Sequence, residues 1–384
     1  MTPKLKIYKR KNNWFGRVYI PKEYSDTNSK QEIYFSTGTD DYMRAEKILN
    51  EKYNDLFYQI RHGKFLGNLP LLNIINKFDD HILLEYELGR ITKIYYNNYK
   101  SPIKAVKKFI EEKNIKKFEK KTLKIDYLNF RKLENPDIRN TSLHQEFNAL
   151  RLVMRWAELN DLVGKNDLPE YPTLKKEDNR RTFFRPDEYK SLLKTSRLRF
   201  QEREVSEETR FLRERLHWWI VFMVGCGLRV SEAQHLKFGD IKEFTKNNIK
   251  QLEIAVREGK TGSRLVVSEN SSYQAIIKLK QLYLKNGVRI DKSTNVFQTN
   301  TFSKSLNNLL EACDLKTDDR LNKKRDGKSF RQTYISWEII KNKRNLHWIA
   351  KNCGNSIEVI QKNYANNLTQ EDFFSEKINA IPIV

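Results

Sequence analysis

Cysteine and histidine are scarce in this chain, which limits the chemistry open to it. Its 384 residues include three well-separated cysteines, Cys226, Cys313 and Cys353. An odd number of distant cysteines favours a reducing compartment over a disulfide framework. The six histidines form no HExxH pattern and the cysteines form no CxxC pattern. The sequence therefore predicts no metal site and no cofactor.

Long apolar runs are also lacking. No run approaches the roughly 18 residues that a membrane span requires. The basic N-terminus is not followed by the apolar segment of a secretory signal. We therefore expect a cytoplasmic protein with no membrane partner.

Acidic residues are too few to balance the basic ones. Lys and Arg number 72 against 49 Asp and Glu, which gives a formal net charge of +23. Such an excess, spread over the whole chain, is typical of proteins that bind a polyanion such as nucleic acid. The alternative is a basic surface that water alone solvates. The length predicts two to three domains.

Residues 1–64 are predicted to form a small β-sheet with one helix. Aromatic and β-branched residues alternate in two stretches between residues 6 and 35, which predicts strands. A helix is expected from Asp40 to about Ile60, with Thr39 or Asp40 as its cap.

The first 22 residues combine basic and aromatic side chains and contain no acid. This pattern is typical of a sheet that lies in a nucleic acid groove. Trp14 has two interpretations that the sequence leaves open: it contacts nucleic acid, or it packs the sheet on its helix.

Residues 71–163 are predicted to form an all-helical bundle. Helical periodicity recurs in four blocks, 71–88, 92–113, 122–133 and 142–161. Glycine and proline mark a hinge over 63–70, and a stretch without periodicity over 164–184 is expected to be a linker.

The residues from Arg185 onward are predicted to be mostly helical. An apolar helix should end near Gly225 and Gly227, and Ser231 should cap a short helix after it. A pair of strands is expected over 251–256 and 264–267. The predicted fold class is thus multidomain and mainly α: a small N-terminal β-sheet plus helix, an all-α bundle, and a mixed α+β domain.

Six residues of this last third are the candidate catalytic residues: Arg229, Lys260, Lys328, Arg331, Asn355 and Tyr364. Cationic donors can neutralise the charge that develops on a phosphodiester under attack, while a phenolic oxygen is the nucleophile. Such a set needs no metal. The stretch Gly259 to Arg264 lacks the upstream glycine of a phosphate-binding P-loop, which argues against an ATP site.

The order and spacing of these residues resemble the tyrosine recombinase, or phage integrase, family. Gly227 to Glu232 resembles the first arginine box, and Lys328 to Arg331 occupies the position of the second, where most members have His-x-x-Arg. Gly354 to Ser356 occupies the Gly-His-Ser box. Asn355 departs from the usual histidine or tryptophan, and Tyr364 follows it by nine residues, the usual spacing.

The resemblance implies an enzyme that cuts and rejoins DNA through a 3′-phosphotyrosyl intermediate. Tyr364 would be the nucleophile, and Lys260 would protonate the leaving 5′ oxygen. The charge on the phosphate would be stabilised by Arg229, Lys328, Arg331 and Asn355. Glu232 would orient the site without reacting.

The resemblance also implies three domains: an arm-binding module (1–64), a core-binding domain (71–163) and a catalytic domain (180–384). Its partners would be double-stranded DNA with core and arm sites, further copies of the chain in a tetramer on the synapse, and a host bending factor or an excision factor. We expect an integrase of a prophage or genomic island that associates with the nucleoid. Two alternatives stay open: a type IB topoisomerase, and a non-catalytic DNA-binding protein derived from a recombinase.

Overall fold

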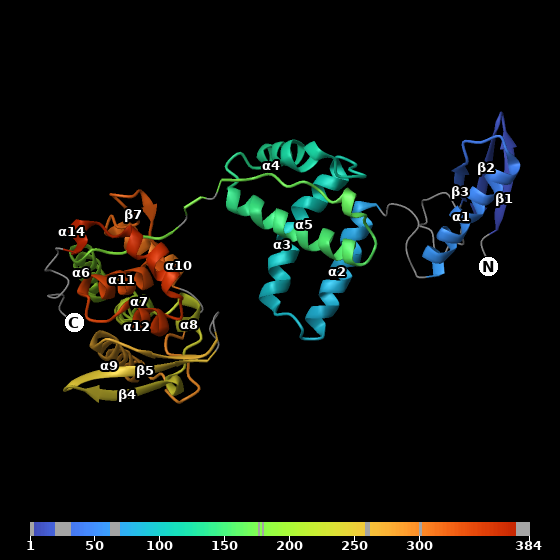
Figure 1. Ribbon diagram of the computed structural model, residues 1–384. Helices are drawn as coiled ribbons and strands as arrows, with labels where there is room; N and C mark the ends of the chain where they lie inside the picture. The colour runs from blue at the N-terminus through green and yellow to red at the C-terminus, as the bar shows by residue number, and fades with distance from the viewer. Residues whose placement is uncertain are drawn as a thin grey trace. The chain divides into compact units, whose positions relative to one another are not determined.

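A computed structural model shows how these segments fold. It describes residues 4–19, 32–61, 70–175, 177–178, 180–257, 262–298 and 302–373. The elements divide into two compact units, 1–177 and 178–384 (Figure 1). Helices dominate both, with small antiparallel sheets, which confirms the predicted fold class. No helix in the described part of the chain is long and apolar enough to cross a membrane.

The first unit begins with the predicted small β-sheet, which has three strands. Its strands are β1 (Leu5–Arg10), β2 (Asn13–Tyr19) and β3 (Glu32–Ser36), in the order β1-β2-β3. Helix α1 (Tyr42–Arg61) covers one face. A Cβ on Gly16 of β2 would lie 2.6 Å from Cδ2 of Leu49 in α1. The glycine thus allows the sheet and the helix to approach closely.

Two details of this unit bear on the sequence predictions: the cap residue of α1 and the packing of Trp14. The cap of α1 is Asp41, whose Oδ1 accepts the backbone N–H groups of Met43 and Arg44, so Thr39 and Asp40 were the wrong residues. Trp14 packs on the helix end: its ring meets Tyr42 edge-on, and its Nε1 donates to the carbonyl of Asp40.

The four predicted helical blocks agree with the structure to within a few residues. They are α2 (Leu71–Glu87), α3 (Lys93–Glu112), a π-helical turn (Thr122–Asp126) that continues into α4 (Tyr127–Glu134), and α5 (Asn140–Leu159). The aromatic rings of Phe109, Tyr127 and Phe147 pack in sequence at the centre of the bundle. The predicted hinge at 63–70, apart from Pro70, lies outside the described residues. In the described part of the expected linker, the only helical element is one short 3₁₀ turn (Lys165–Asp167).

The second unit is a helical body with a three-stranded sheet at one end (Figure 1). Its main helices, in chain order, are α6 (Pro186–Gln201), α7 (Glu207–Cys226), α8 (Val230–Gln234), α9 (Asn270–Lys285), α10 (Ser303–Ala312), α11 (Gly327–Lys341), α12 (Leu346–Cys353), α13 (Ile357–Asn363) and α14 (Gln370–Phe373). A two-stranded ribbon, β7 (Thr317–Asp318) and β8 (Lys323–Lys324), precedes α11.

The sheet of this unit has one strand more than predicted. The expected pair is β5 (Ile249–Val256) and β6 (Arg264–Val267), and β4 (Ile241–Lys246) pairs with the other edge of β5. Only Ile241 and Phe244 of β4 are partly buried. Their spacing of three residues is not the alternation that marks a half-buried strand, so sequence patterning missed β4.

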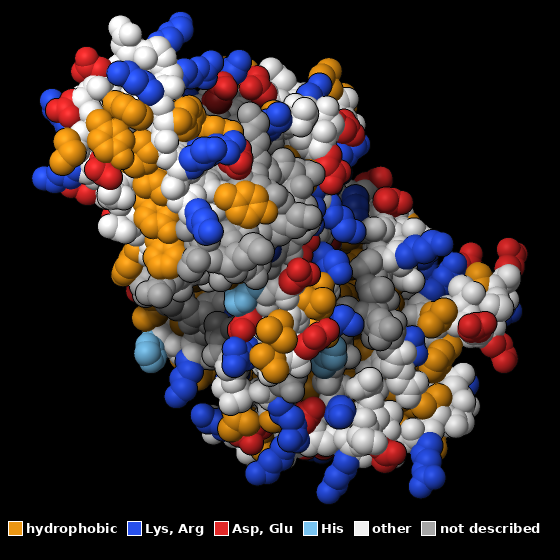
Figure 2. Space-filling view, turned by 90° about the vertical axis from the view of Figure 1, so that its right-hand side faces the viewer, with side chains coloured by type: hydrophobic (Ala, Val, Ile, Leu, Met, Phe, Trp, Pro, Cys, Tyr) orange, Lys and Arg blue, Asp and Glu red, His pale blue; other side chains and the backbone are white. Residues whose placement is uncertain are grey.

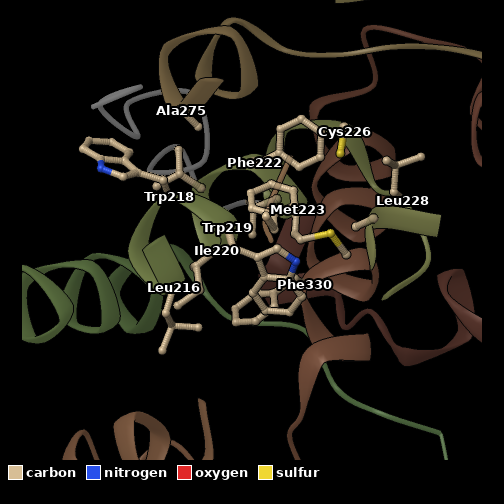
Figure 3. Packing of buried hydrophobic residues seen from close by; sticks show 14 of the residues in the cluster. Leu216, Trp218, Trp219, Ile220, Phe222, Met223, Cys226, Leu228, Ala275 and Phe330 are labelled. Atoms are coloured by element: carbon tan, nitrogen blue, oxygen red, sulfur yellow. The ribbon is translucent and has the colours of Figure 1, made fainter. Parts of the chain in front are cut away.

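Helix α7 runs through the core of the second unit. All its residues from Arg215 to Cys226 are buried, as expected for a helix that is apolar on every side. Figure 3 shows Trp219, Phe222 and Met223 from this helix gathered beside Phe330 of α11. The helix ends at Cys226, as predicted, and Gly227 is its C-cap residue. Gly227 has φ +63°, and a Cβ there would lie 2.2 Å from the ring of Tyr334.

Candidate active site

Arg229 is placed by the start of helix α8. Arg229, not the predicted Ser231, is the N-cap residue of this helix, and one carboxylate oxygen of Glu232 accepts the backbone N–H of Arg229 at 2.8 Å. A glutamate at the third helical position satisfies an N-terminal amide in this way. The other carboxylate oxygen accepts from Nη1 of Arg229 at 2.7 Å.

The second terminal nitrogen of Arg229 reaches the turn after α12. Its Nη2 donates to the carbonyl oxygen of Gly354 at 2.6 Å and to Oδ1 of Asn355 at 3.1 Å. Gly354 makes this turn possible because it has φ +64°, a conformation that glycine adopts without penalty. Arg229 therefore joins the first arginine box to the Gly-Asn-Ser box.

Arg331 joins the same two segments through two other backbone carbonyls. It lies on α11, whose first turn is capped by Asp326 through the backbone N–H of Lys328. Its side chain is 6% exposed. Nη1 donates to the carbonyl of Gly227 and Nη2 to the carbonyl of Cys353, each at 2.6 Å. The two arginines thus hold the ends of α7 and α12 together.

Tyr364 lies beside Arg331. It follows the last turn of α13, where its backbone N–H bonds to the carbonyl of Ile360 at 3.0 Å. Burial alone would lower the pKa of the Arg331 guanidinium. Charge interactions with Cys353 and Tyr364, and a side-chain hydrogen bond with Tyr364, instead raise that pKa above its ordinary value. The phenol therefore lies near the buried guanidinium.

The two lysines differ in what the structure shows of them. Lys328 is exposed, one helical turn before Arg331 on α11. It lines a cavity of about 160 Å³ together with Val230, the residue after Arg229. Lys260 lies outside the described residues, in the connection between β5 and β6. Of the six predicted residues, the structure thus brings together Arg229, Arg331, Asn355 and Tyr364, with Lys328 at the edge of the group.

Arg264 is a residue of this site that sequence reasoning missed. From the first position of β6 it donates to both oxygens of Glu232, at 2.9 and 2.7 Å, and to the carbonyl of Asn352 at 3.1 Å. Burial would raise the pKa of Glu232, but hydrogen bonds from Arg264 and Arg229 outweigh it and hold that pKa at about 2. Glu232 is therefore a carboxylate at neutral pH.

Two arginines at the start of the second unit brace the same site. Arg180 donates from Nη1 to the carbonyl of Lys362 at 2.7 Å, in the last turn of α13 before Tyr364. Arg181 pairs with the capping residue Asp326 at 2.7 Å. Both lie in the predicted linker, where no local pattern indicated that they fold back onto α11 and α13.

The arrangement suits recognition of a phosphate group. Guanidinium groups donate in a planar fork that matches the oxygens of a phosphate. Oδ1 of Asn355 accepts from Arg229, so its NH₂ group is the part that can donate to an oxyanion. Among the described residues, no three His, Cys, Asp or Glu side chains come together in a way that could hold a metal ion.

Comparison with known proteins gives likenesses in structure only. No protein-family model matches the chain, and no curated protein matches it. A lambda integrase tetramer bound to a Holliday junction aligns with a TM-score of 0.53 at 14% identity, covering 93% of this chain and 95% of that one. XerH recombinase bound to a palindromic difH substrate, in a post-cleavage complex, gives 0.52 at 15%, covering 86% and 87%.

A third likeness is to the Tn1549 transposon integrase in complex with a circular intermediate DNA. It has a TM-score of 0.51 at 14% identity and covers 82% of this chain and all of that one. Identities this low establish the fold alone. The chain therefore has the tyrosine recombinase fold.

Proposed function

We propose that this protein is a site-specific DNA recombinase that cuts and rejoins DNA through a covalent bond to Tyr364. The observation that carries the proposal is the meeting of two arginine boxes with the nucleophile. Arg229 donates to Gly354 and Asn355, and Arg331 donates to Gly227 and Cys353. Tyr364 lies close enough to Arg331 to help raise the pKa of its guanidinium.

In the proposed reaction, Oη of Tyr364 attacks the phosphorus of a DNA phosphodiester. A bond forms between the phenolic oxygen and phosphorus, the bond from phosphorus to the 5′ oxygen breaks, and the phenolic proton is lost. The products are a 3′-phosphotyrosyl bond and a free 5′ hydroxyl. Because one phosphodiester replaces another, the reverse step with a different 5′ hydroxyl rejoins the strand.

The cationic groups stabilise the charge that develops on the phosphate. Arg229 and Arg331 would contact the non-bridging oxygens, with the amide of Asn355 as a further donor. Lys328 lies at the edge of the group, where its ammonium adds positive charge. Lys260 would protonate the leaving 5′ oxygen from the hairpin between β5 and β6.

The proposed partner is double-stranded DNA. The strand register places mainly basic and aromatic side chains on the sheet face of β1 to β3 opposite α1, among them Lys6, Tyr8, Arg10, Phe15, Arg17 and Tyr34. Glu32 lies on the same face, where it pairs with Arg17 and accepts a hydrogen bond from Tyr34. Basic and aromatic groups on an open sheet suit a DNA groove. We infer that this module, residues 1–64, binds arm-type sites.

The remaining parts follow the same proposal. The bundle at 71–163 would bind the core site and residues 180–384 would cut it, with four copies acting on one synapse. The lambda integrase structure with which this chain aligns is a tetramer on a Holliday junction. A prophage or genomic island is the proposed carrier of the gene.

The proposal is tested with a suicide duplex. Duplexes that the protein selects from a randomised pool are synthesised with a nick at successive positions, so that the short 5′-hydroxyl fragment diffuses away after cleavage. A recombinase becomes trapped on the DNA and migrates as a complex that resists SDS. Binding without any trapped complex would contradict the proposed enzyme and leave a DNA-binding protein.

A further inference from the structure

Arg264 occupies a position that connects three parts of the second unit. It is the first residue of β6, the strand that leaves the hairpin carrying Lys260. Its side chain is 10% exposed, and its guanidinium donates to both oxygens of Glu232. Its Nε donates to the carbonyl of Asn352 near the end of α12. One side chain thus contacts the support of Arg229 and the helix that leads to Asn355.

A second contact between β6 and α12 runs beside the first. The side chain of Asn352 accepts the backbone N–H of Val267 at 2.8 Å and donates to the carbonyl of Val267 at 3.1 Å. Arg264 and Asn352 therefore fasten both ends of the four-residue strand to α12. A Cβ on Gly354 would lie 3.0 Å from the guanidinium carbon of Arg264, so the turn that carries Asn355 rests directly on this arginine.

We propose that Arg264 is a positioning residue that sets Arg229 and Asn355 for catalysis by fixing Glu232 and the end of α12. The inference rests on the proposed function and adds a residue that does not itself touch the phosphate. Its bidentate bond to Glu232 leaves that carboxylate one orientation, in which it accepts from both the backbone and the side chain of Arg229. Rotation of Glu232 would release Arg229.

The charges around Glu232 predict a pH dependence of the rate that tests this role. The charged and titratable groups that face it are Arg229, Arg264, Arg331 and the thiol of Cys226. Burial raises the pKa of the Cys226 thiol to about 12, so it stays neutral. Loss of Arg264 removes the partner that accounts most for the low pKa of Glu232, while the burial that raises it persists. The pKa of Glu232 should then rise, and its hold on Arg229 should weaken as the pH is lowered.

The test compares Arg264→Gln with Arg264→Lys and a matched control. Arg257→Gln is the control, because Arg257 lies at the other side of the same hairpin but is 74% exposed and pairs with Asp240. We expect Arg264→Gln to slow trapping on the suicide duplex by about 10²-fold, the scale of a misplaced catalytic group. Arg264→Lys should be intermediate, since it keeps the charge but not the fork. The control should stay near wild type.

The pH profile separates positioning from a loss of DNA affinity or of fold. In wild type, Glu232 stays ionised down to a pKa of about 2, so it contributes no acid limb above pH 5. The rate of Arg264→Gln should fall as the pH is lowered from 8 towards 5, and the double variant with Glu232→Gln should lack that limb. A pH profile identical to wild type, or an equal loss of rate in Arg257→Gln, would overturn the proposal.

Amide hydrogen exchange of the free protein provides a readout that needs no catalysis. Arg264→Gln should speed exchange in peptides covering 264–267 and 352–356 and not elsewhere. If wild type traps no DNA but this local change occurs, the proposed function fails, and only the bracing of Glu232 and the end of α12 by Arg264 stands. If wild type traps DNA and Arg264→Gln matches it in rate and exchange, the positioning role fails and the function stands.

Discussion

At the scale of single residues, the site is built from side chains that each hold another in place. Arg229 and Arg331 use part of their donor capacity on backbone carbonyls of two turns. Their orientation is therefore fixed before any phosphate arrives, and preorganised donors stabilise a developing charge better than groups that must reorient. Asn355 extends this arrangement, because Arg229 holds its amide oxygen.

Asn355→Ala and Asn355→Asp test the role of this amide. Both remove the NH₂ donor, and the aspartate keeps an oxygen that Arg229 can hold. We expect both variants to be trapped on the suicide duplex more slowly than wild type, by at most about 10²- to 10³-fold, the range for one lost oxyanion donor. Asn355→His should be tolerated, because its ring can also donate. Alanine at the wild-type rate would show that Asn355 does not contact the reacting phosphate.

At the scale of elements, helix ends position the site. Arg229 follows the end of α7, Asn355 follows the end of α12 and Tyr364 follows the end of α13. The first two ends are glycines with positive φ, Gly227 and Gly354. A short turn after a buried helix fixes the backbone position of a residue while leaving its side chain accessible to a ligand.

Gly227→Ala tests this use of a helix end, and Gly287→Ala is its control. Both glycines have positive φ, but a Cβ on Gly287 meets nothing within 4 Å, whereas one on Gly227 collides with Tyr334. The left-handed conformation alone should cost Gly287→Ala about 1–2 kcal/mol of unfolding free energy. Gly227→Ala should lose more, and should lose trapping activity too. Equal losses in urea unfolding would show that the contact with Tyr334 relaxes without cost.

His217 makes the stability of the second unit depend on pH. Burial in α7, with the charge of Arg197, lowers its pKa to about 3, whereas an unfolded chain has about 6.5. The unfolded state therefore binds the extra proton between these values, and stability falls as the pH drops below about 6.5. We expect His217→Leu to reduce the slope between pH 5 and 6.5, by at most about 1.4 kcal/mol per pH unit.

Tryptophan fluorescence can follow this unfolding, because Trp218 packs edge-on against His217, with ring centroids 4.7 Å apart. Urea midpoints of wild type and His217→Leu would be compared at several pH values. Parallel lines for the two proteins would contradict a neutral, buried His217.

The sequence predicted elements best where periodicity is strong. The four blocks of the bundle and the strand β5 agree with the structure because each buries apolar residues at the spacing of its element. Strand β4 was missed because few of its residues are even partly buried. The cap of α8 was assigned to the wrong residue because a single side-chain hydrogen bond, from the backbone N–H of Arg229 to Glu232, decides it. Arg264 could not be found from sequence patterning: its partners lie 32 and 88 residues away, and only the tertiary fold brings them together.

At the scale of the whole molecule, the excess of basic residues is distributed. Figure 2 shows Lys and Arg side chains scattered over the described parts of the face in view, with acidic side chains among them rather than one basic patch. A net charge of +23 over 384 residues then favours contact with DNA at many places. Each phosphate that the protein neutralises releases counterions into solution.

DNA binding should therefore weaken steeply with salt. A plot of log affinity against log salt between about 50 and 200 mM should be linear, with a slope of about −0.9 for each neutralised phosphate. Fluorescence anisotropy of a labelled duplex gives the slope. A flat response would argue against DNA as the partner, and a slope below −5 would indicate at least five phosphate contacts.

The central claim is that Tyr364 forms the covalent bond to DNA, and peptide mapping of the trapped complex tests it most directly. Nuclease and protease digestion followed by mass spectrometry should find the nucleotide on the peptide that contains Tyr364. Tyr364→Phe should trap no DNA while binding the duplex as wild type does, because one hydroxyl contributes little to a large electrostatic interface. Tyr273→Phe, a buried tyrosine outside the site, should be trapped normally. A nucleotide on another residue, or a trapped Tyr364→Phe protein, would contradict the account.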